Sequence, residues 1–205
     1  MKYVLVGYNQ DFSWIKDYTD DFLVYDRSET DDFIKDLPPE KVIKTPNLGN
    51  ADFDKLCYLL DNYDNLPEVF LWGKTNLFKY ITKEEFDLVK DNKEFTPLLT
   101  QNHKVSSDNL GPVSYYSGGI YHERNPLLYS DDFKYCKDYP EFAYMFQLPN
   151  PYYIPFAPGG NYILTRERVH RYSRDFYEKM AKVLPYAREP LEAHFCERSY
   201  YNIWK

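Results

Sequence analysis

The sequence lacks long apolar runs, paired cysteines and an excess of basic residues, and each absence excludes a class of protein. Its apolar stretches fall far short of the ~20 residues of a membrane-spanning helix, so no membrane span is expected. The three cysteines, Cys57, Cys136 and Cys196, are odd in number and widely separated. This spacing does not match a zinc finger and is typical of reduced, structural thiols in a cytoplasmic protein.

Positive charge is scarce as well. The chain has 25 Lys and Arg residues against 32 Asp and Glu residues, which gives a net charge of −7. A general nucleic-acid-binding protein needs a basic face to neutralise phosphates, so we do not expect a nucleic-acid partner. A small phosphate-bearing ligand stays compatible with this balance, because a few local donors or a metal ion can hold it.

The common catalytic and nucleotide-binding motifs are also missing. The sequence contains no G-x-x-x-x-G-K-[ST], G-x-G-x-x-G, G-x-S-x-G or H-E-x-x-H pattern. Its first residues, 1–7, include a short apolar stretch without a small-residue cleavage site. They are predicted to form a strand and not a signal peptide, which again favours a cytoplasmic location.

Aromatic residues, in contrast, are abundant. The 22 tyrosines, 14 phenylalanines and 3 tryptophans make up 19% of the 205 residues. They supply enough buriable surface to argue against disorder. Tyrosine clusters also suit sugar recognition, because the ring stacks on a pyranose face while the hydroxyl bonds to sugar hydroxyls. Each tyrosine is therefore equally compatible with a core position and with a sugar contact.

The predicted elements alternate between strands and helices over much of the chain. The nearly all-apolar run 68–72 is typical of a central strand that is covered on both faces. We predict one α/β domain with a mixed, mostly parallel central sheet flanked by helices. Residues 103–158 show weak periodicity and are expected to form functional loops with short elements. The predicted strands cover 3–7, 22–25, 42–43, 68–72, 97–100 and 162–164, and the predicted helices cover 11–15, 51–63, 82–92, 165–183 and 190–204.

Ligands of open α/β sheets bind outside the carboxyl ends of the strands. Here this rule selects the segments 7–9, 26–28, 47–50 and 73–76. Each of them could instead be a polar turn that only connects two elements. The residues selected as possible ligand contacts are Gly7, Tyr8, Asn9, Asp26, Arg27, Asn47, Gly49, Lys74, Thr75 and Asn76.

Each segment offers a different contact. Gly7 permits close approach of a ligand, and Tyr8 offers a stacking platform. Asp26 could accept hydrogen bonds from a base or ribose, and Arg27 could pair with a phosphate. Gly49 could let a backbone N–H face a phosphate where a helix begins, and the helix dipole favours an anion there.

The last predicted helix carries the densest set of polar side chains. His194, Glu197 and Arg198 are spaced by three and four residues and can share one face. His194 could be a metal ligand or bond to a phosphate oxygen, and Glu197 could be a base, a metal partner or a sugar ligand. A packed interior Glu–Arg pair is the alternative.

Four blocks of the chain, in order, resemble a family of GT-A type glycosyltransferases. Residues 6–14 resemble the pattern ARYNEDLSWL, and residues 47–51 resemble N-x-G-R-E-A. Residues 61–73 resemble I-x-N-Y-D-N-L-P-D-x-x-x-F-L-H-G, which is the most specific block. Residues 195–204 resemble ERLW-x-x-I-F. The chain also resembles the N-terminal glycosyltransferase domains of chlorovirus proteins that build the glycan of the major capsid protein.

The resemblance implies one GT-A domain over 1–205, with a nucleotide-sugar-binding half at 1–100 and an acceptor-binding half at 101–205. This domain could be the N-terminal part of a longer protein. The implied activity is transfer of rhamnose or glucose from a UDP-sugar to a glycan or glycoprotein acceptor, with manganese or magnesium as cofactor. A capsid-protein glycan in the host cytoplasm is the implied acceptor, and a monomer is the default state.

The chain departs from this family at the expected metal site. Segment 73–76 stands where GT-A enzymes usually carry Asp-x-Asp after the central strand, and it contains no carboxylate. A metal ion would need other ligands, such as His194 with diphosphate oxygens and water. Alternatively, the cation of Lys74 replaces part of the metal's charge.

Catalysis is assigned to Lys74 at the diphosphate and to Glu192 or Glu197 as the base of an inverting reaction. Lys74, Asn76, His194 and Arg198 complete the expected donor contacts. The competing hypotheses are a non-catalytic nucleotide-sugar or glycan-binding module and a nucleotide-sugar hydrolase. The expected acceptor contacts are Tyr115, Tyr116, Gly118, Gly159, Gly160 and Asn161.

Overall fold

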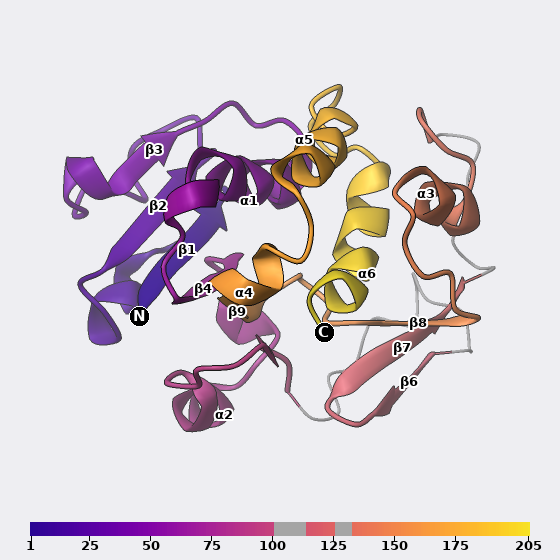
Figure 1. Cartoon of the computed structure of the whole chain (residues 1–205). Helices are drawn as coiled ribbons and strands as arrows, with labels where there is room; N and C mark the ends of the chain where they lie inside the picture. Colours follow the sequence, from indigo (N-terminus) through magenta and orange to yellow (C-terminus); the bar gives the residue numbers. More distant parts are fainter. Residues whose placement is uncertain (101–113, 126–132) are drawn as a thin grey trace.

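A six-stranded sheet forms the centre of the molecule (Figure 1). The computed structural model describes residues 1–100, 114–125 and 133–205. The strands of the central sheet follow the order β3-β2-β1-β4-β9-β5. They are β1 (Lys2–Gly7), β2 (Phe22–Asp26), β3 (Val42–Lys44), β4 (Val69–Lys74), β5 (Thr96–Pro97) and β9 (Tyr162–Thr165).

The sheet is mixed and mostly parallel, as the alternating pattern predicts. Strands β1 to β4 pair in parallel, whereas β9 runs antiparallel to both β4 and β5. Strand β4 lies between β1 and β9, and its residues Phe70, Leu71 and Trp72 have no exposed surface. The prediction of a central strand over 68–72 is therefore confirmed.

Helices flank the sheet, and several of their boundaries follow from local sequence signals. Thr82 forms a capping box with Glu85 at the start of α2, as the capping sequence predicts. Besides short 3-10 turns, the described helices are α1 (Asn50–Asp61), α2 (Lys83–Val89), α3 (Tyr139–Met145), α4 (Arg166–Val169), α5 (Arg174–Lys182) and α6 (Glu192–Trp204).

The two faces of the sheet carry separate cores, because successive strand side chains point to opposite faces. Val4 and Val6 of β1 pack into one core, which α1, α5 and α6 cover. Tyr3 and Leu5 pack into the other, which includes Phe86 of α2 and the short helical turns at 13–17 and 77–79. The chain thus forms a single α/β domain.

One long predicted helix is divided in the structure. The prediction of a continuous helix over 165–183 is wrong, since α4 ends at Val169 and α5 begins at Arg174. Ser173 starts the second helix by accepting a hydrogen bond from the N–H of Phe176. The segment between them is held by Tyr63, whose hydroxyl donates to the carbonyl of Tyr172 at 2.7 Å. Contacts distant in sequence therefore override the local helical periodicity.

A second, three-stranded antiparallel sheet packs against α6 (Figure 1). Its strands are β6 (Ser114–Ser117), β7 (Ile120–Arg124) and β8 (Tyr153–Phe156), in that order. A buried ion pair joins this sheet to α6: the guanidinium of Arg198 donates two hydrogen bonds to Glu123 of β7, one of them at 3.1 Å. This pair places β7 against the helix that also supports the central sheet.

No helix within the described ranges is long and apolar enough to cross a membrane. The three cysteines are free thiols, and burial raises the pKa of Cys57 to about 11 and that of Cys136 to about 12. These thiols are therefore protonated and weakly nucleophilic near neutral pH.

We expect Arg198→Met to lower the free energy of unfolding by about 3–5 kcal/mol, because it leaves the carboxylate of Glu123 buried without its cation. Urea denaturation measures the change. The double variant Arg198→Met/Glu123→Leu is the control and should recover much of the loss. Loss of an exposed pair typically changes the free energy of unfolding by no more than ~1 kcal/mol. A change that small in the single variant would contradict a buried pair.

Candidate functional site

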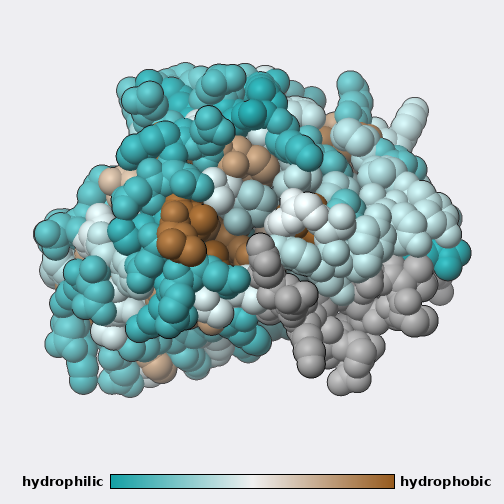
Figure 2. Space-filling view, turned by 90° about the horizontal axis from the view of Figure 1, so that it is seen from below, coloured by the Kyte–Doolittle hydropathy of each residue, from teal (hydrophilic) through white to brown (hydrophobic). Residues whose placement is uncertain are grey.

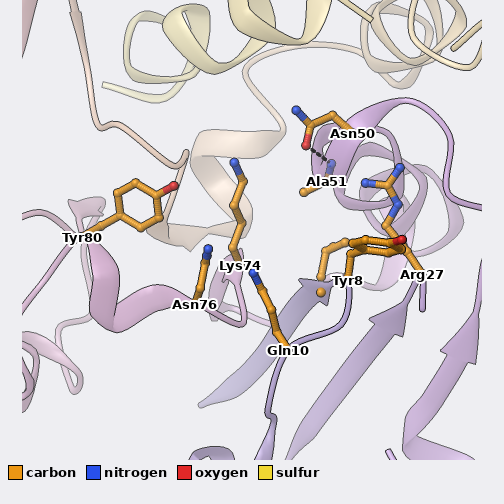
Figure 3. A pocket seen from close by; sticks show the side chains of 10 residues that line it. Tyr8, Gln10, Arg27, Asn50, Ala51, Lys74, Asn76 and Tyr80 are labelled. Carbon is orange, nitrogen blue, oxygen red and sulfur yellow. Dashed lines mark hydrogen bonds between the residues drawn. The ribbon is translucent and has the colours of Figure 1, made fainter. Parts of the chain in front are cut away.

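The carboxyl ends of β1, β2 and β4 meet around one open pocket (Figure 3). The parallel register brings these ends together, since Gly7 pairs with Asp26 and Val6 pairs with Lys74. The pocket has a volume of about 160 Å³ and is open to solvent. Its lining residues are Val6, Gly7, Tyr8, Gln10, Arg27, Asn50, Ala51, Lys74, Asn76 and Tyr80.

Lys74 reaches the pocket from the end of β4 as half of an ion pair. Its Nζ lies 3.5 Å from Oε2 of Glu197 on α6, and each side chain is 16% exposed. Burial alone would lower the pKa of Lys74, but the carboxylates of Glu197 and Asp52 raise it. Burial alone would also raise the pKa of Glu197, but the neighbouring cations, Lys74 first, lower it. Both groups are therefore charged at neutral pH.

Arg27 lines the pocket from the loop after β2 and is also paired. Its Nε lies 3.2 Å from Oδ2 of Asp54 on α1, and its Nη2 donates to the carbonyl of Leu48 at 2.7 Å. Burial raises the pKa of Asp54 to about 6, although the cation of Arg27 opposes this shift. The guanidinium is thus held in place at the pocket wall by two partners.

Another cation, Lys55 of α1, is completely buried. Its Nζ donates to the carbonyl of Gly160 at 2.7 Å, lies 3.9 Å from Asp52 and sits over the ring of Trp72 at 4.4 Å. Burial lowers the pKa of Lys55 to about 8. The sequence analysis missed this residue, because its place in an amphipathic helix resembles that of a solvated lysine.

The turn that Lys55 holds contains three of the expected acceptor residues, Gly159, Gly160 and Asn161. Both glycines have positive φ angles, +85° and +61°. A Cβ on Gly159 would come within 2.7 Å of the ring of Tyr80, so only glycine fits there. Oδ1 of Asn161 accepts a hydrogen bond from the backbone N–H of Lys74 at 2.7 Å. This turn therefore adjoins the pocket.

The N-terminus of α1 does not offer its first amides to a ligand. The N–H of Gly49 donates to the carbonyl of Ala187 at 2.8 Å, and that of Asn50 donates to the carbonyl of Arg188 at 3.0 Å. These bonds do not support a phosphate contact at the amides of Gly49 and Asn50, because a loop distant in sequence accepts from both of them. Asn47 does not line the pocket, whereas Asn50 does.

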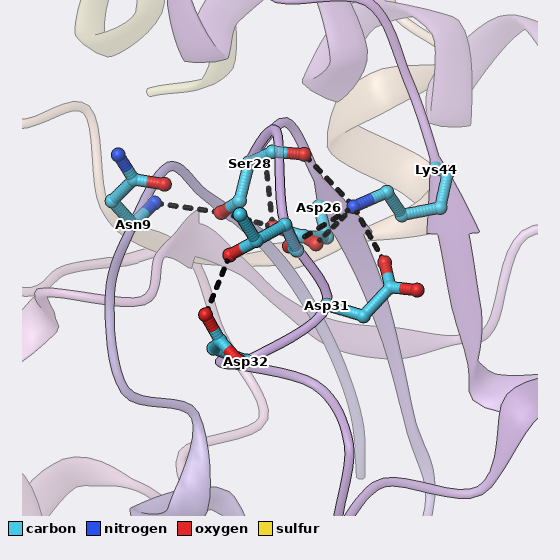
Figure 4. Close-up of polar contacts among 7 residues, drawn as sticks. Asn9, Asp26, Ser28, Asp31, Asp32 and Lys44 are labelled. Atoms are coloured by element: carbon cyan, nitrogen blue, oxygen red, sulfur yellow. Dashed lines mark hydrogen bonds and ion pairs between the residues drawn. The ribbon is translucent and has the colours of Figure 1, made fainter.

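Asp26 is engaged in a local network (Figure 4). Its carboxylate is fully buried and accepts from the N–H and Oγ of Ser28 at 3.1 and 2.6 Å and from Lys44 Nζ at 3.0 Å. Oγ of Ser28 in turn accepts from the N–H of Asn9 at 2.7 Å. Asp26 therefore holds the loops after β1 and β2 together, which does not support the expected contact to a base or ribose.

The residues after Lys74 differ in their availability. Thr75 is buried, and its hydroxyl donates to Oε1 of Gln10 at 2.6 Å, so it positions a pocket residue. Asn76 lines the pocket, and its Oδ1 is buried without a hydrogen-bond partner among the described residues. Since a buried acceptor without a partner is uncommon, Oδ1 of Asn76 is a candidate to accept a hydrogen bond from a ligand.

All four of the expected residues on α6 lie outside the pocket lining, although Glu197 pairs with the pocket residue Lys74. Glu192 is fully buried, and Oε1 accepts from the N–H groups of Lys134 and Tyr135 at 2.8 and 2.7 Å. Arg198 is bound to Glu123, as described above. His194 is an exposed residue overall, while partial burial of its imidazole and then the Arg198 cation lower its pKa. Structural contacts thus occupy Glu192 and Arg198.

The tyrosine segment of the hairpin β6–β7 lies at a different place. Tyr116 and Gly118 line a second, more apolar pocket of about 380 Å³ with α2 residues such as Leu88, which is 83% exposed. Figure 2, which views the molecule from below, shows brown hydrophobic surface on this face. The ring of Tyr115 stacks on His122, with centroids 4.7 Å apart. These residues do not join the first pocket.

The side chains around the first pocket do not fit a divalent cation. Within residues 1–100, 114–125 and 133–205, no group of three or more His, Cys, Asp or Glu side chains is placed to hold a metal ion. Lys74, Thr75 and Asn76 stand at the end of β4, where the GT-A resemblance leads one to expect carboxylates. A positive side chain therefore stands where the resemblance implies a metal ion.

Comparison with known proteins adds no family to these observations. No protein-family model matches the chain, and no curated protein or solved structure is significantly similar to it.

The buried Lys55 predicts a pH effect. The native state releases the Lys55 proton near pH 8, whereas the unfolded chain keeps it to about pH 10.4. The unfolded state then binds more protons, so Lys55 makes stability rise with pH above 8, by at most about 1.4 kcal/mol per pH unit. Urea denaturation of the wild type and Lys55→Met between pH 7 and 9.5 measures this difference. If the free energy of unfolding changes with pH in the same way in the wild type and in Lys55→Met, this role of Lys55 is contradicted.

Proposed function

We propose that this chain is a glycosyltransferase that transfers a sugar, rhamnose or glucose, from a UDP-sugar to a glycan acceptor. One observation carries the proposal: the pocket at the carboxyl edge of the sheet, with Lys74 and Arg27 in its wall. Open α/β sheets bind nucleotides at this edge. Arg and Lys side chains with amide donors, such as those of Gln10 and Asn76, are suited to a diphosphate.

The chemistry assigns a role to each charged group. In an inverting transfer, the acceptor oxygen forms a bond to the anomeric carbon while the bond from that carbon to the phosphate oxygen breaks. UDP leaves with the electron pair, so negative charge grows on the diphosphate. A cation fixed beside it, here Lys74, favours this transition state over the ground state.

The proton of the acceptor hydroxyl passes to a carboxylate in the inverting case. Glu197 is the residue assigned to this step, because it lies 3.5 Å from Lys74. Glu192 is not retained for it, since backbone amides and the hydroxyl of Tyr186 occupy its oxygens. A retaining reaction needs no such base.

The acceptor is assigned to the turn 159–161, beside Lys74 and Tyr80. Tyr116 and Gly118 belong to a separate pocket and would contact only a more distant part of a long glycan. A capsid-protein glycan as acceptor, the host cytoplasm as location and manganese as cofactor are supported by the resemblance alone. We assign the metal's electrostatic role to Lys74.

A non-catalytic nucleotide-sugar or glycan-binding module is the second candidate. Two observations favour it: both pocket cations already have carboxylate partners, and segment 73–76 carries no carboxylate. A nucleotide-sugar hydrolase is a third candidate, which would release free sugar at full rate without an acceptor.

Thermal shift with UDP, GDP, ADP and TDP tests the donor site, because a ligand of the native state raises the melting temperature. We expect a shift with UDP alone, unchanged by a chelator. A UDP shift that requires manganese would mean that a metal ion takes part in donor binding. Absence of a shift with every nucleotide would overturn the donor assignment and favour the glycan-binding module.

Replacing Lys74 by Met should slow sugar transfer by at least about 100-fold, since electrostatic groups of this kind contribute roughly 10²–10³ in rate. Product formation from UDP-rhamnose or UDP-glucose measures it. The variant also leaves Glu197 without its closest cation. The double variant Lys74→Met/Glu197→Gln is the stability control and should regain stability without activity. Equal losses of activity and stability in both variants would reject the role of Lys74.

A further inference from the structure

Arg188 lies beside the pocket, in the loop before α6, and no sequence motif marked it. Its guanidinium is 4.5 Å from the ring centroid of Tyr8, which lines the pocket. It is also near enough to Arg27 for the two positive charges to repel, which contributes to a lower pKa of Arg27 after the effect of burial. Arg188 is therefore a third cation at this edge of the sheet.

The backbone of Arg188 is fixed while its side chain is accessible. The carbonyls of Ala187 and Arg188 accept from the N–H groups of Gly49 and Asn50 at 2.8 and 3.0 Å. These bonds tie the loop to the N-terminus of α1, whose residues Asn50 and Ala51 line the pocket. The side chain is 55% exposed. Only side-chain rotation is needed to move the guanidinium from the Tyr8 ring.

The three cations differ in how far their charge is already compensated. Lys74 has Glu197 at 3.5 Å, and Arg27 has Asp54 at 3.2 Å, with all four side chains largely or fully buried. Within the part of the chain that the structure describes, the ion-pair partner of Arg188 is Glu189 at 4.0 Å, which is 78% exposed. Exposed pairs of this length contribute little, because water screens them. Among the described cations at the pocket, Arg188 therefore has the charge that is least compensated.

We propose that Arg188 is a binding residue for the phosphate groups of the ligand, which it reaches by exchanging its contact with the Tyr8 ring for bonds to phosphate oxygens. The inference rests on the proposed function and extends it to a residue outside the predicted site. The planar guanidinium presents parallel N–H groups that match two phosphate oxygens. The contact that it gives up is a cation–π interaction at a half-exposed site, which is weak.

Titration calorimetry with UDP, uridine and inorganic pyrophosphate tests this role. We expect Arg188→Ala to weaken UDP and pyrophosphate binding by about tenfold or more, as for loss of a charge-assisted bidentate contact, and uridine binding by less than about twofold. Arg188→Lys should fall between, since it keeps the charge but loses the fork.

Arg171→Ala is the matched control. Arg171 is 43% exposed and has a comparably long ion pair, 3.9 Å to Glu167, but it lines a different pocket, together with Tyr172 and Phe176, and does not contact Tyr8. This variant changes the net charge equally and should leave the affinity for UDP within about twofold of the wild type. A loss as large as that of Arg188→Ala would mean that overall charge decides the affinity, which overturns the inference.

Two further outcomes overturn it, and one separates it from the proposed function. An unchanged UDP affinity in Arg188→Ala contradicts a phosphate contact. Equal losses for uridine and UDP would show that Arg188 acts by supporting the Tyr8 ring. In the last outcome, the wild type binds pyrophosphate but neither UDP nor uridine, and Arg188→Ala loses the affinity for pyrophosphate. This result would reject the nucleotide-sugar function and retain the phosphate-binding role of Arg188.

Discussion

The charges buried beneath the carboxyl edge of the central sheet are the constraint on which the rest of the arrangement depends. Asp52 and Lys55 come from α1, Lys74 from β4 and Glu197 from α6, and each has an opposite charge within 4 Å. Removing one member of a buried pair commonly costs about 3–5 kcal/mol, because the remaining charge is left without a partner. The Lys74–Glu197 pair joins β4 to α6, and Lys55 joins α1 to β4 through its contact with the Trp72 ring, so these elements hold the pocket wall in place.

The same cluster couples the pocket to the turn before β9. Lys55 holds the carbonyl of Gly160, and Asn161 accepts the backbone N–H of Lys74. Glycines at positive φ let the turn pass close to the ring of Tyr80. The segments on either side of the pocket are therefore fixed by backbone hydrogen bonds as well as by charge. Such preorganisation is what a site for charge stabilisation needs.

Most polar groups at the strand ends are used to build this edge of the sheet. Asp26 binds Ser28 and Lys44, and the amide of Gly49 binds the loop at Ala187. Among the described residues, the groups that still face a ligand include the wall residues Lys74 and Asn76, and Arg188 at the rim. This division between structural and available groups determines which side chains can act on a ligand.

The sequence by itself determined most elements of the central sheet and the edge of that sheet at which a pocket forms. Apolar periodicity and the capping box of Thr82 are local, and parallel strands place the segments after Gly7 and Trp72 side by side. Only the tertiary structure decided which polar residues remain available. Arg198 is paired with Glu123 and Gly49 with Ala187, while Arg188 lies on Tyr8. These partners are far apart in the chain, so no local pattern encodes their meeting.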